Sequence, residues 1–111
     1  MGDKPLVLIP ALNEQATIQE VVSSVIAQGF HVVVIDDGSG DLTSALARQA
    51  GATILKLRIN LGVGGAMRCG FRYAVNNGYQ SVVQCDADGQ HPTLHIQELI
   101  NVSDKTSSHL V

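Results

Sequence analysis

The sequence lacks the aromatic and basic residues that several classes of binding protein require. It has no tryptophan, two phenylalanines and two tyrosines, too few rings for a platform on which single-stranded nucleic acid stacks. The formal net charge of −3 gives no support for a nucleic-acid partner, because phosphates select a basic surface. Its two cysteines, Cys69 and Cys85, show no metal-ligand spacing, and we interpret both as reduced, buried thiols. We therefore expect a cytosolic protein without a nucleic-acid partner.

Long apolar runs are also missing. No stretch reaches the roughly 18 uninterrupted apolar residues of a membrane span, and Pro10 ends the first apolar run too early for a signal peptide. The 111 residues, of which 45% are hydrophobic, are enough for one domain with a core. We expect this domain to occupy residues 1–100. Residues 101–111 lack apolar periodicity and predict a poorly ordered tail.

Four short apolar runs alternate with helical patterns along the chain. Residues 6–9, 32–35, 53–57 and 81–85 predict strands that are buried on both faces, which is typical of parallel sheets. Parallel neighbours need crossover connections, so the alternation predicts right-handed crossovers and helices on both faces of a mostly parallel sheet. We expect an α/β fold with the strand order 3-2-1-4.

The segments between the runs predict four helices. Apolar residues at helical spacing occupy positions 18–26, and Asn13 is the expected N-cap of that helix. Asp41 is the expected cap of the second helix. That helix carries Leu42, Ala45, Leu46 and Ala50. The glycine-rich segment 58–65 predicts a loop before the third helix, and residues 93–100 predict the last one.

Polar clusters follow three of the four predicted strands. They are P-A-L-N-E at 10–14, D-D-G-S at 36–39 and D-A-D-G at 86–89. Open α/β sheets bind ligands outside the carboxyl ends of their strands, at the point where the strand order reverses. With the order 3-2-1-4 this crevice opens between the first and fourth strands. The coincidence of the three clusters therefore predicts a ligand site there.

Asp86 and Asp88 stand one residue apart at the end of the fourth predicted strand. Ionised carboxylates beside a buried strand need a partner, and several oxygen ligands at one turn suit Mg²⁺ or Mn²⁺. The alternative is a polar turn in which both residues only cap backbone amides. The D-x-D-G letters also resemble the aspartyl-nucleophile pattern of haloacid dehalogenase phosphatases, which has Thr or Val where Gln90 stands.

Three further features suit a nucleotide, and each has an ordinary structural alternative. A carboxylate of Asp36 or Asp37 can accept a hydrogen bond from a nucleobase, or can simply form part of the loop. The backbone of 60–65 can approach a phosphate at a helix N-terminus, but it matches neither a dinucleotide fingerprint nor a P-loop. Arg68 can reach a diphosphate or remain in solvent, and Glu14 can bind a ribose hydroxyl or favour its helix terminus.

Together, four motifs resemble the family 2 glycosyltransferases of the GT-A fold. They are P-A-L-N-E (10–14), D-D-G-S (36–39), N-L-G-V-G-G-A-M-R-C-G-F (60–71) and C-D-A-D-G-Q-H-P (85–92). They look most like the branch that contains dolichyl- and polyprenyl-phosphate mannose and glucose synthases, and their order at predicted strand ends makes the match specific. The resemblance implies the Rossmann-like donor-binding half of a metal-dependent inverting glycosyltransferase.

The resemblance also implies roles for individual residues. Those assigned to the nucleotide-sugar donor are Pro10, Ala11, Glu14, Asp37, Gly62, Gly64, Arg68 and Asp86. Asp37 would meet the base, and the first three would line the nucleoside pocket. Asp86 and Asp88 would hold Mg²⁺ or Mn²⁺ against the diphosphate, where the metal stabilises charge on the leaving nucleotide. The donor would be a UDP-, GDP- or dTDP-sugar, and the acceptor a polyprenyl phosphate.

The chain departs from this family pattern in two ways. Val63 stands where members of the branch often carry lysine, and the chain stops soon after D-x-D. We therefore expect domain 1–100 to be truncated, with the catalytic base, the acceptor half and any membrane-associating segment beyond Val111. The full-length form would be cytoplasmic and peripheral at the membrane. The alternative is a non-catalytic nucleotide-binding fragment that needs a partner chain or the missing half, and an open sheet edge predicts self-association.

Overall fold

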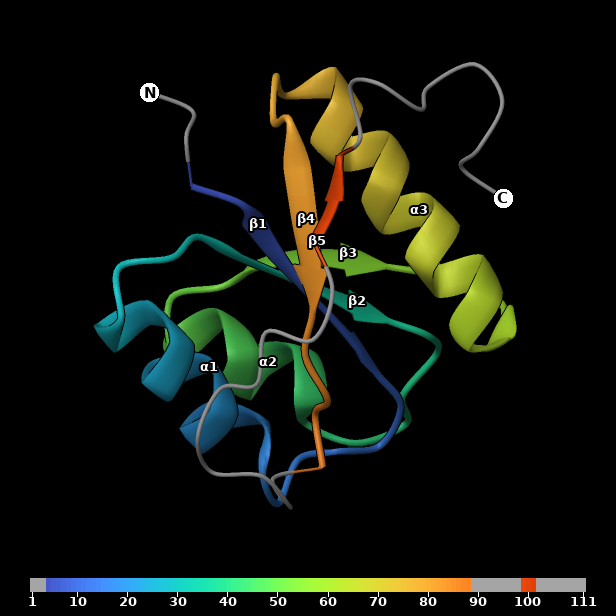
Figure 1. Ribbon diagram of the computed structural model, residues 1–111. Helices are drawn as coiled ribbons and strands as arrows, with labels where there is room; N and C mark the ends of the chain where they lie inside the picture. Colours follow the sequence, from blue (N-terminus) through green and yellow to red (C-terminus); the bar gives the residue numbers. More distant parts are fainter. Residues whose placement is uncertain (1–3, 89–98, 102–111) are drawn as a thin grey trace.

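A parallel sheet with helices on both faces forms the centre of the protein. The computed structural model describes residues 4–88 and 99–101. The strands are β1 (Leu6–Ala11), β2 (Val32–Asp36), β3 (Thr53–Lys56), β4 (Ser81–Gln84) and β5 (Leu99–Asn101), and the helices are α1 (Ile18–Ala27), α2 (Thr43–Gln49) and α3 (Gly62–Asn76) (Figure 1). Within these residues no helix has the length and apolar character needed to cross a membrane.

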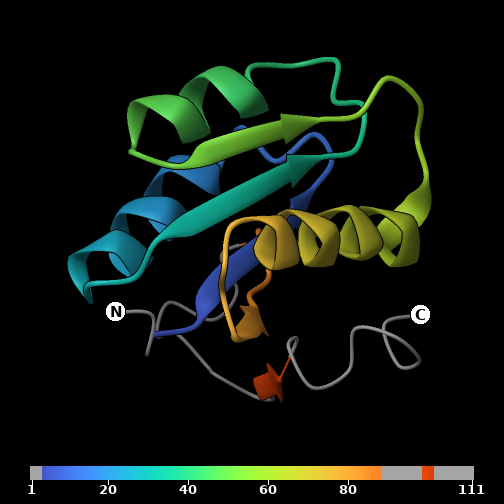
Figure 2. The ribbon, with the colours of Figure 1, turned by 90° about the horizontal axis from the view of Figure 1, so that it is seen from above.

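The sheet has the order β3-β2-β1-β4-β5. The first three of these pairings are parallel, and β5 pairs antiparallel with β4. Helices α1 and α2 lie on one face and α3 on the other (Figure 2). The predicted α/β class, the order 3-2-1-4 and the mostly parallel sheet are therefore confirmed.

The central strand β1 is buried on both faces, as its uninterrupted apolar run predicts. Its side chains alternate between two cores. Val7 and Ile9 pack with α1 and α2, whereas Leu6 and Leu8 pack with α3. A methyl group added at Gly70 would lie 2.9 Å from Leu8 Cδ1. The missing side chain of Gly70 thus allows α3 to lie close against the sheet.

The start of α1 differs from the prediction. Asn13 has a φ of 56°, and its side-chain oxygen accepts a hydrogen bond from the backbone N–H of Gly40 at 2.9 Å. The helix begins later, at Ile18, after a turn in which the Glu14 carbonyl accepts the N–H groups of Thr17 and Ile18. The expectation that Asn13 is the N-cap is wrong. Asparagine tolerates the left-handed conformation, and here it joins two loops.

Helix α2 buries a different face from the one its apolar residues suggest. Leu42 is 60% exposed. The buried residues of α2 are Thr43, Ser44 and Ala47. The Ser44 hydroxyl donates to the Asp36 carboxylate and the Thr43 hydroxyl to Asp41, so these polar groups are buried with partners. Asp41, the expected cap, accepts the Thr43 N–H at 2.9 Å, but the N-cap position is occupied by Leu42, which makes no side-chain cap hydrogen bond.

Strand β5 is not predicted by the sequence. The pattern at 93–100 predicts a helix, but Leu99 and Ile100 lie in β5, so that prediction is wrong for these two residues. The rest of the segment lies outside the described residues. The outer edge of β4 offers unpaired backbone groups, and pairing with them overrides a weak helical pattern. The predicted tail, 101–111, also lies outside the description, apart from Asn101, which belongs to β5.

Candidate functional site

The segments that leave β1, β2 and β4 meet at the carboxyl ends of these strands. Beyond the regular ladders, the Asp37 N–H donates to the carbonyl of Ala11 at 2.9 Å, and the Cys85 N–H donates to the carbonyl of Leu8 at 3.0 Å. Pro10 is half-buried and Ala11 is buried, and together they form the end of β1. The described parts of the three polar clusters therefore lie at one end of the sheet, where strand order predicts a ligand site.

The loops after β1 and β2 are interlocked by side-chain hydrogen bonds. The Asn13 N–H donates to Ser39 Oγ at 2.8 Å, and the Glu14 N–H donates to Thr43 Oγ1 at 2.9 Å. The Gln15 side chain accepts the N–H of Leu42 at 3.0 Å. These contacts fix the backbone position of Glu14. The sequence gives no sign of them, since every pair is separated by more than twenty residues.

Asp37 links the end of β2 to the start of α3. It is 5% exposed, and its two carboxylate oxygens accept the backbone N–H groups of Leu61 at 2.7 Å and Gly62 at 2.9 Å. Negative charge at a helix N-terminus is favourable. The Gly62 N–H also donates to Asn60 Oδ1 at 3.1 Å, so Asp37 shares this donor with Asn60. The predicted loop is shorter as a result, and Gly62 and Gly64 lie exposed in the first turn of α3. A carboxylate keeps further lone pairs, and its contact with a base stays a prediction.

Asp36, the other acid of D-D-G-S, is engaged with its own protein. It is 1% exposed and accepts the Ser39 N–H at 2.8 Å and the Ser44 hydroxyl. Burial alone would raise its pKa, but the hydrogen bonds from Ser44 and Ser39, together with the charge of Lys56, hold the pKa of Asp36 below its usual value. Asp36 therefore remains ionised and orders the loop.

The D-A-D segment after β4 directs its two acids outward. Asp86 and Asp88 are exposed, whereas Ala87 between them is buried. The carbonyl of Ala87 accepts the Thr17 hydroxyl at 2.6 Å, which attaches the segment to the start of α1. The sequence analysis missed Thr17, and no local signal marks a contact between residues 70 positions apart. This tether holds the backbone between the two acids against the start of α1.

The acids of this edge repel one another. Burial and the negative charges of Asp88 and Asp41 raise the pKa of Glu14. Burial and the charges of Asp86 and Asp88 likewise raise the pKa of the Cys85 thiol. The D-x-D carboxylates therefore act electrostatically on the loops after β1 and β4 together. A bound cation would relieve this repulsion.

The donor set fits a divalent metal that a ligand helps to hold. Within 4–88 and 99–101, no three His, Cys, Asp or Glu side chains are grouped in a way that could hold a metal. Asp86 and Asp88 supply two carboxylates, and Mg²⁺ typically takes one or two from protein and its remaining oxygens from phosphates and water. These two acids would thus hold the metal only together with a phosphate-bearing ligand.

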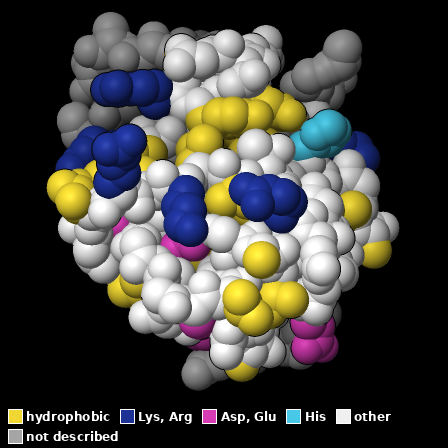
Figure 3. Space-filling view, turned by 180° about the vertical axis from the view of Figure 1, so that it is seen from behind, with side chains coloured by type: hydrophobic (Ala, Val, Ile, Leu, Met, Phe, Trp, Pro, Cys, Tyr) yellow, Lys and Arg dark blue, Asp and Glu magenta, His cyan; other side chains and the backbone are white. Residues whose placement is uncertain are grey.

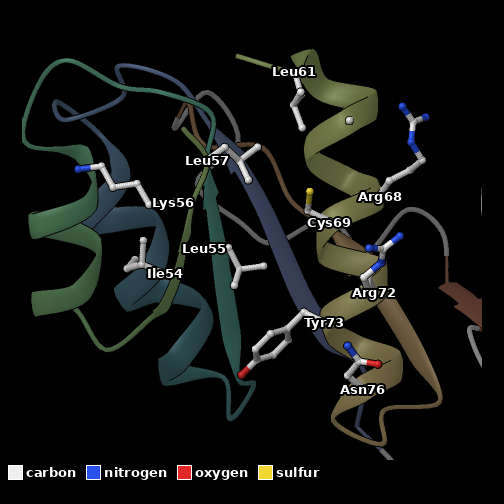
Figure 4. Close-up of a pocket in the computed structure, with 11 residues that line it drawn as sticks. Ile54, Leu55, Lys56, Leu57, Leu61, Arg68, Cys69, Arg72, Tyr73 and Asn76 are labelled. Atoms are coloured by element: carbon white, nitrogen blue, oxygen red, sulfur yellow. The ribbon is translucent and has the colours of Figure 1, made fainter. Parts of the chain in front are cut away.

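Arg68 lies on a different surface. It is exposed on α3 and lines a groove of about 640 Å³ between that helix and β3 (Figure 4). The lining of this groove includes none of Glu14, Asp37, Asp86 and Asp88. Contact of Arg68 with a diphosphate therefore stays a prediction, and the site above is built without it.

Comparison with known proteins identifies one family. The sequence model described as Glycosyl transferase family 2 matches residues 6–111. The chain is 31% identical, over 91% of its length and 41% of the relative, to polyprenol monophosphomannose synthase of Mycolicibacterium smegmatis. It is 31% identical, over 90% of its length and 47% of the relative, to UDP-N-acetylglucosamine–dolichyl-phosphate N-acetylglucosaminyltransferase of Methanococcus voltae.

A solved structure shares the same fold. Glucosyl-3-phosphoglycerate synthase from Mycobacterium tuberculosis, in complex with Mn²⁺, UDP and glucosyl-3-phosphoglycerate, superimposes with a TM-score of 0.65 at 29% identity. The match covers 81% of this chain and 36% of that one. The chain spans less than half the length of the curated relatives described above.

Proposed function

The chain belongs to glycosyltransferase family 2, and on that premise we propose that it binds the nucleotide of a nucleotide-sugar donor at the carboxyl ends of β1, β2 and β4. Pro10, Ala11 and Glu14 would line the nucleoside pocket, and Asp37 would accept a hydrogen bond from the base. The exposed first turn of α3, with Gly62 and Gly64, would lie along the nucleotide.

The arrangement of D-x-D carries this proposal. Asp86 and Asp88 point into solvent at the strand end where open α/β sheets bind ligands, and the charge of Asp88 raises the pKa of Glu14 across the crevice. A metal–diphosphate complex would supply positive charge and further oxygen ligands beside these two carboxylates. The mycobacterial enzyme of similar fold was solved with Mn²⁺ and UDP, which supports the same ligand class here.

Within a longer protein, this half would serve an inverting sugar transfer. An oxygen of the acceptor attacks the anomeric carbon, the bond from that carbon to the nucleoside diphosphate breaks, and the nucleotide leaves with the electron pair. Mg²⁺ or Mn²⁺ held by Asp86 and Asp88 would supply charge neutralisation for the leaving diphosphate. Polyprenyl phosphate is the acceptor class that the named relatives suggest. We place the longer protein in the cytoplasm, at the membrane surface.

Calorimetric titration tests the proposal. UDP, GDP and dTDP are titrated into the protein with Mn²⁺ and again with a chelator, and one nucleotide is expected to bind only with metal. Asp88→Ala is expected to abolish this binding. The matched control is Glu20→Ala, which removes an exposed acid from the first turn of α1. Binding that persists with chelator or in Asp88→Ala would refute the metal–nucleotide site.

A second reading is a non-catalytic nucleotide-binding half, which the partial coverage of its relatives favours. Incubation with the bound nucleotide's sugar derivative and a polyprenyl phosphate separates the two readings. Turnover by this chain would exclude the non-catalytic reading. Turnover only after a C-terminal half or partner chain is added would support it.

A further inference from the structure

We propose that the groove between α3 and β3 binds an extended acidic segment of another polypeptide, which adds to the sheet as a strand beside β3. The groove is separate from the carboxylate site and holds about 640 Å³. Its place at the end of the sheet, its floor and its charge each support this occupant.

The backbone edge of β3 is accessible from the groove. Residues 54–57, four in succession, all line it. Leu55 and Leu57 point towards α3, whereas Ile54 and Lys56 point away (Figure 4). Because alternate side chains leave a strand on opposite faces, a cavity that all four line must reach the peptide groups between them. β3 is the terminal strand of the described sheet, and such an edge pairs readily with an added strand.

The floor of the groove is apolar and recessed. Leu55, Leu57, Cys69 and Tyr73 are half-buried and pack against the core beneath α3. In a strand added beside β3, every second side chain would face α3 and cover this floor. A lipid surface suits protruding apolar side chains instead, so the recess favours a polypeptide over a membrane.

The charged side chains among the described residues that line the groove are all basic. Arg68 and Arg72 stand one turn apart on α3, Lys56 belongs to β3, and all three are exposed. Among the described residues that line the groove, none is acidic. Seen from behind, the molecule presents Lys and Arg side chains beside exposed hydrophobic ones, with Asp and Glu side chains also present on this face (Figure 3). Carboxylates complement such a rim, whereas a second copy paired symmetrically through the same edge would bring its own Lys56, Arg68 and Arg72 against it.

A fluorescent peptide of alternating glutamate and valine is the probe, and anisotropy at low salt is the measurement. The control peptides replace glutamate with lysine, or place proline at every second position to remove N–H donors. The protein variant Arg68→Gln/Arg72→Gln removes two rim charges, and Arg48→Gln is the matched control, an exposed arginine at the end of α2 that does not line the groove. Hydrogen exchange at residues 53–56 reports strand addition.

We expect the acidic peptide to bind saturably and to slow amide hydrogen exchange in β3. Its affinity should be about tenfold lower for Arg68→Gln/Arg72→Gln and unchanged for Arg48→Gln. Equal binding of the acidic and lysine peptides, or full binding by the proline peptide, would overturn the proposal. So would the absence of saturation at millimolar peptide. Binding to phosphatidylglycerol vesicles through Arg68 and Arg72, without peptide binding, would assign the groove to a membrane surface instead.

Discussion

Replacing Asp37 with alanine separates the structural role of this acid from any role in ligand binding. In the folded protein both carboxylate oxygens are bonded to the N–H groups of Leu61 and Gly62. Asp37→Ala removes this acceptor from the Leu61 N–H, leaves the Gly62 N–H with Asn60 Oδ1 alone, and removes a negative charge from the N-terminus of α3. The variant should therefore be less stable even without nucleotide.

The magnitude follows from the exposure of the two donors. A hydrogen bond to a charged group contributes about 1.5–3 kcal/mol, and this is lost in full when the remaining donor is buried without another partner. Leu61 is 45% exposed, so water replaces the carboxylate there and the usual capping value of about 1 kcal/mol applies. The Gly62 N–H keeps Asn60 Oδ1 as a partner, and loss of the negative charge at the helix N-terminus adds about 1 kcal/mol. The expected loss is about 2 kcal/mol. In a domain of this size each kilocalorie lowers Tm by about 4 °C, giving a decrease of about 8 °C.

Urea and thermal unfolding measure this loss, followed by circular dichroism. Asp37→Asn keeps one acceptor and should fall between the wild type and alanine. Asp86→Ala, the matched control, removes an exposed acid of the same edge and should leave stability unchanged or slightly higher. The usual effect of a surface substitution is about 0.5 kcal/mol. If the free energies of unfolding of Asp37→Ala and of the control differ by no more than this, the two hydrogen bonds do not hold the start of α3.

Three further changes test other parts of the structure. The lowered pKa of Asp36 adds stability that is present above the ordinary pKa of 3.8 and is lost as the pH falls through the lower pKa of the folded protein. The difference in free energy of unfolding between the wild type and Asp36→Asn should therefore narrow in acid, and a constant difference would contradict this. Thr17→Val removes the tether to Ala87 and should weaken metal-dependent nucleotide binding about fivefold by calorimetry; unchanged affinity would show that the tether does not position D-x-D. Gly70→Val should cost about 2 kcal/mol through contact with the sheet, whereas Gly40→Ala, with nothing within 4 Å of the added methyl, should not; equal urea midpoints would refute close packing at Gly70.

The sheet and the position of the site follow directly from local sequence. Apolar runs such as 6–9 and 32–35 have only one stable place in an α/β domain, a strand covered on both faces. Once four such strands alternate with helices, the right-handed crossover connections and the point where the strand order reverses restrict where a ligand binds. Asp86, Asp37 and Glu14 could therefore be grouped before any coordinates were known.

The contacts that hold the site together could not be derived in this way. The Thr17–Ala87 and Asp37–Gly62 hydrogen bonds join residues that are distant in sequence, and nothing in local propensity marks them. Ser44 looks like a surface residue of α2 until its hydroxyl is seen on the buried Asp36 carboxylate. Strand β5 depends on a free edge of β4, which overrides the helical pattern. Each difference arises from a tertiary partner that single-sequence reasoning does not contain.

The strand order also governs how the chain folds as it is made. β1 is synthesised first yet occupies the middle of the sheet, and its Leu6 and Leu8 pair with Val82 and Gln84 of β4. β1, α1 and β2 leave the ribosome early and can assemble, while the other apolar edge of β1 stays open until β4 emerges. Ribosome-bound chains that end before residue 81 should therefore bind hydrophobic dyes and chaperones. Chains extended far enough for β4 to leave the ribosome should not. In the described sheet, the strand at the centre is thus protected only by strands that are made after it.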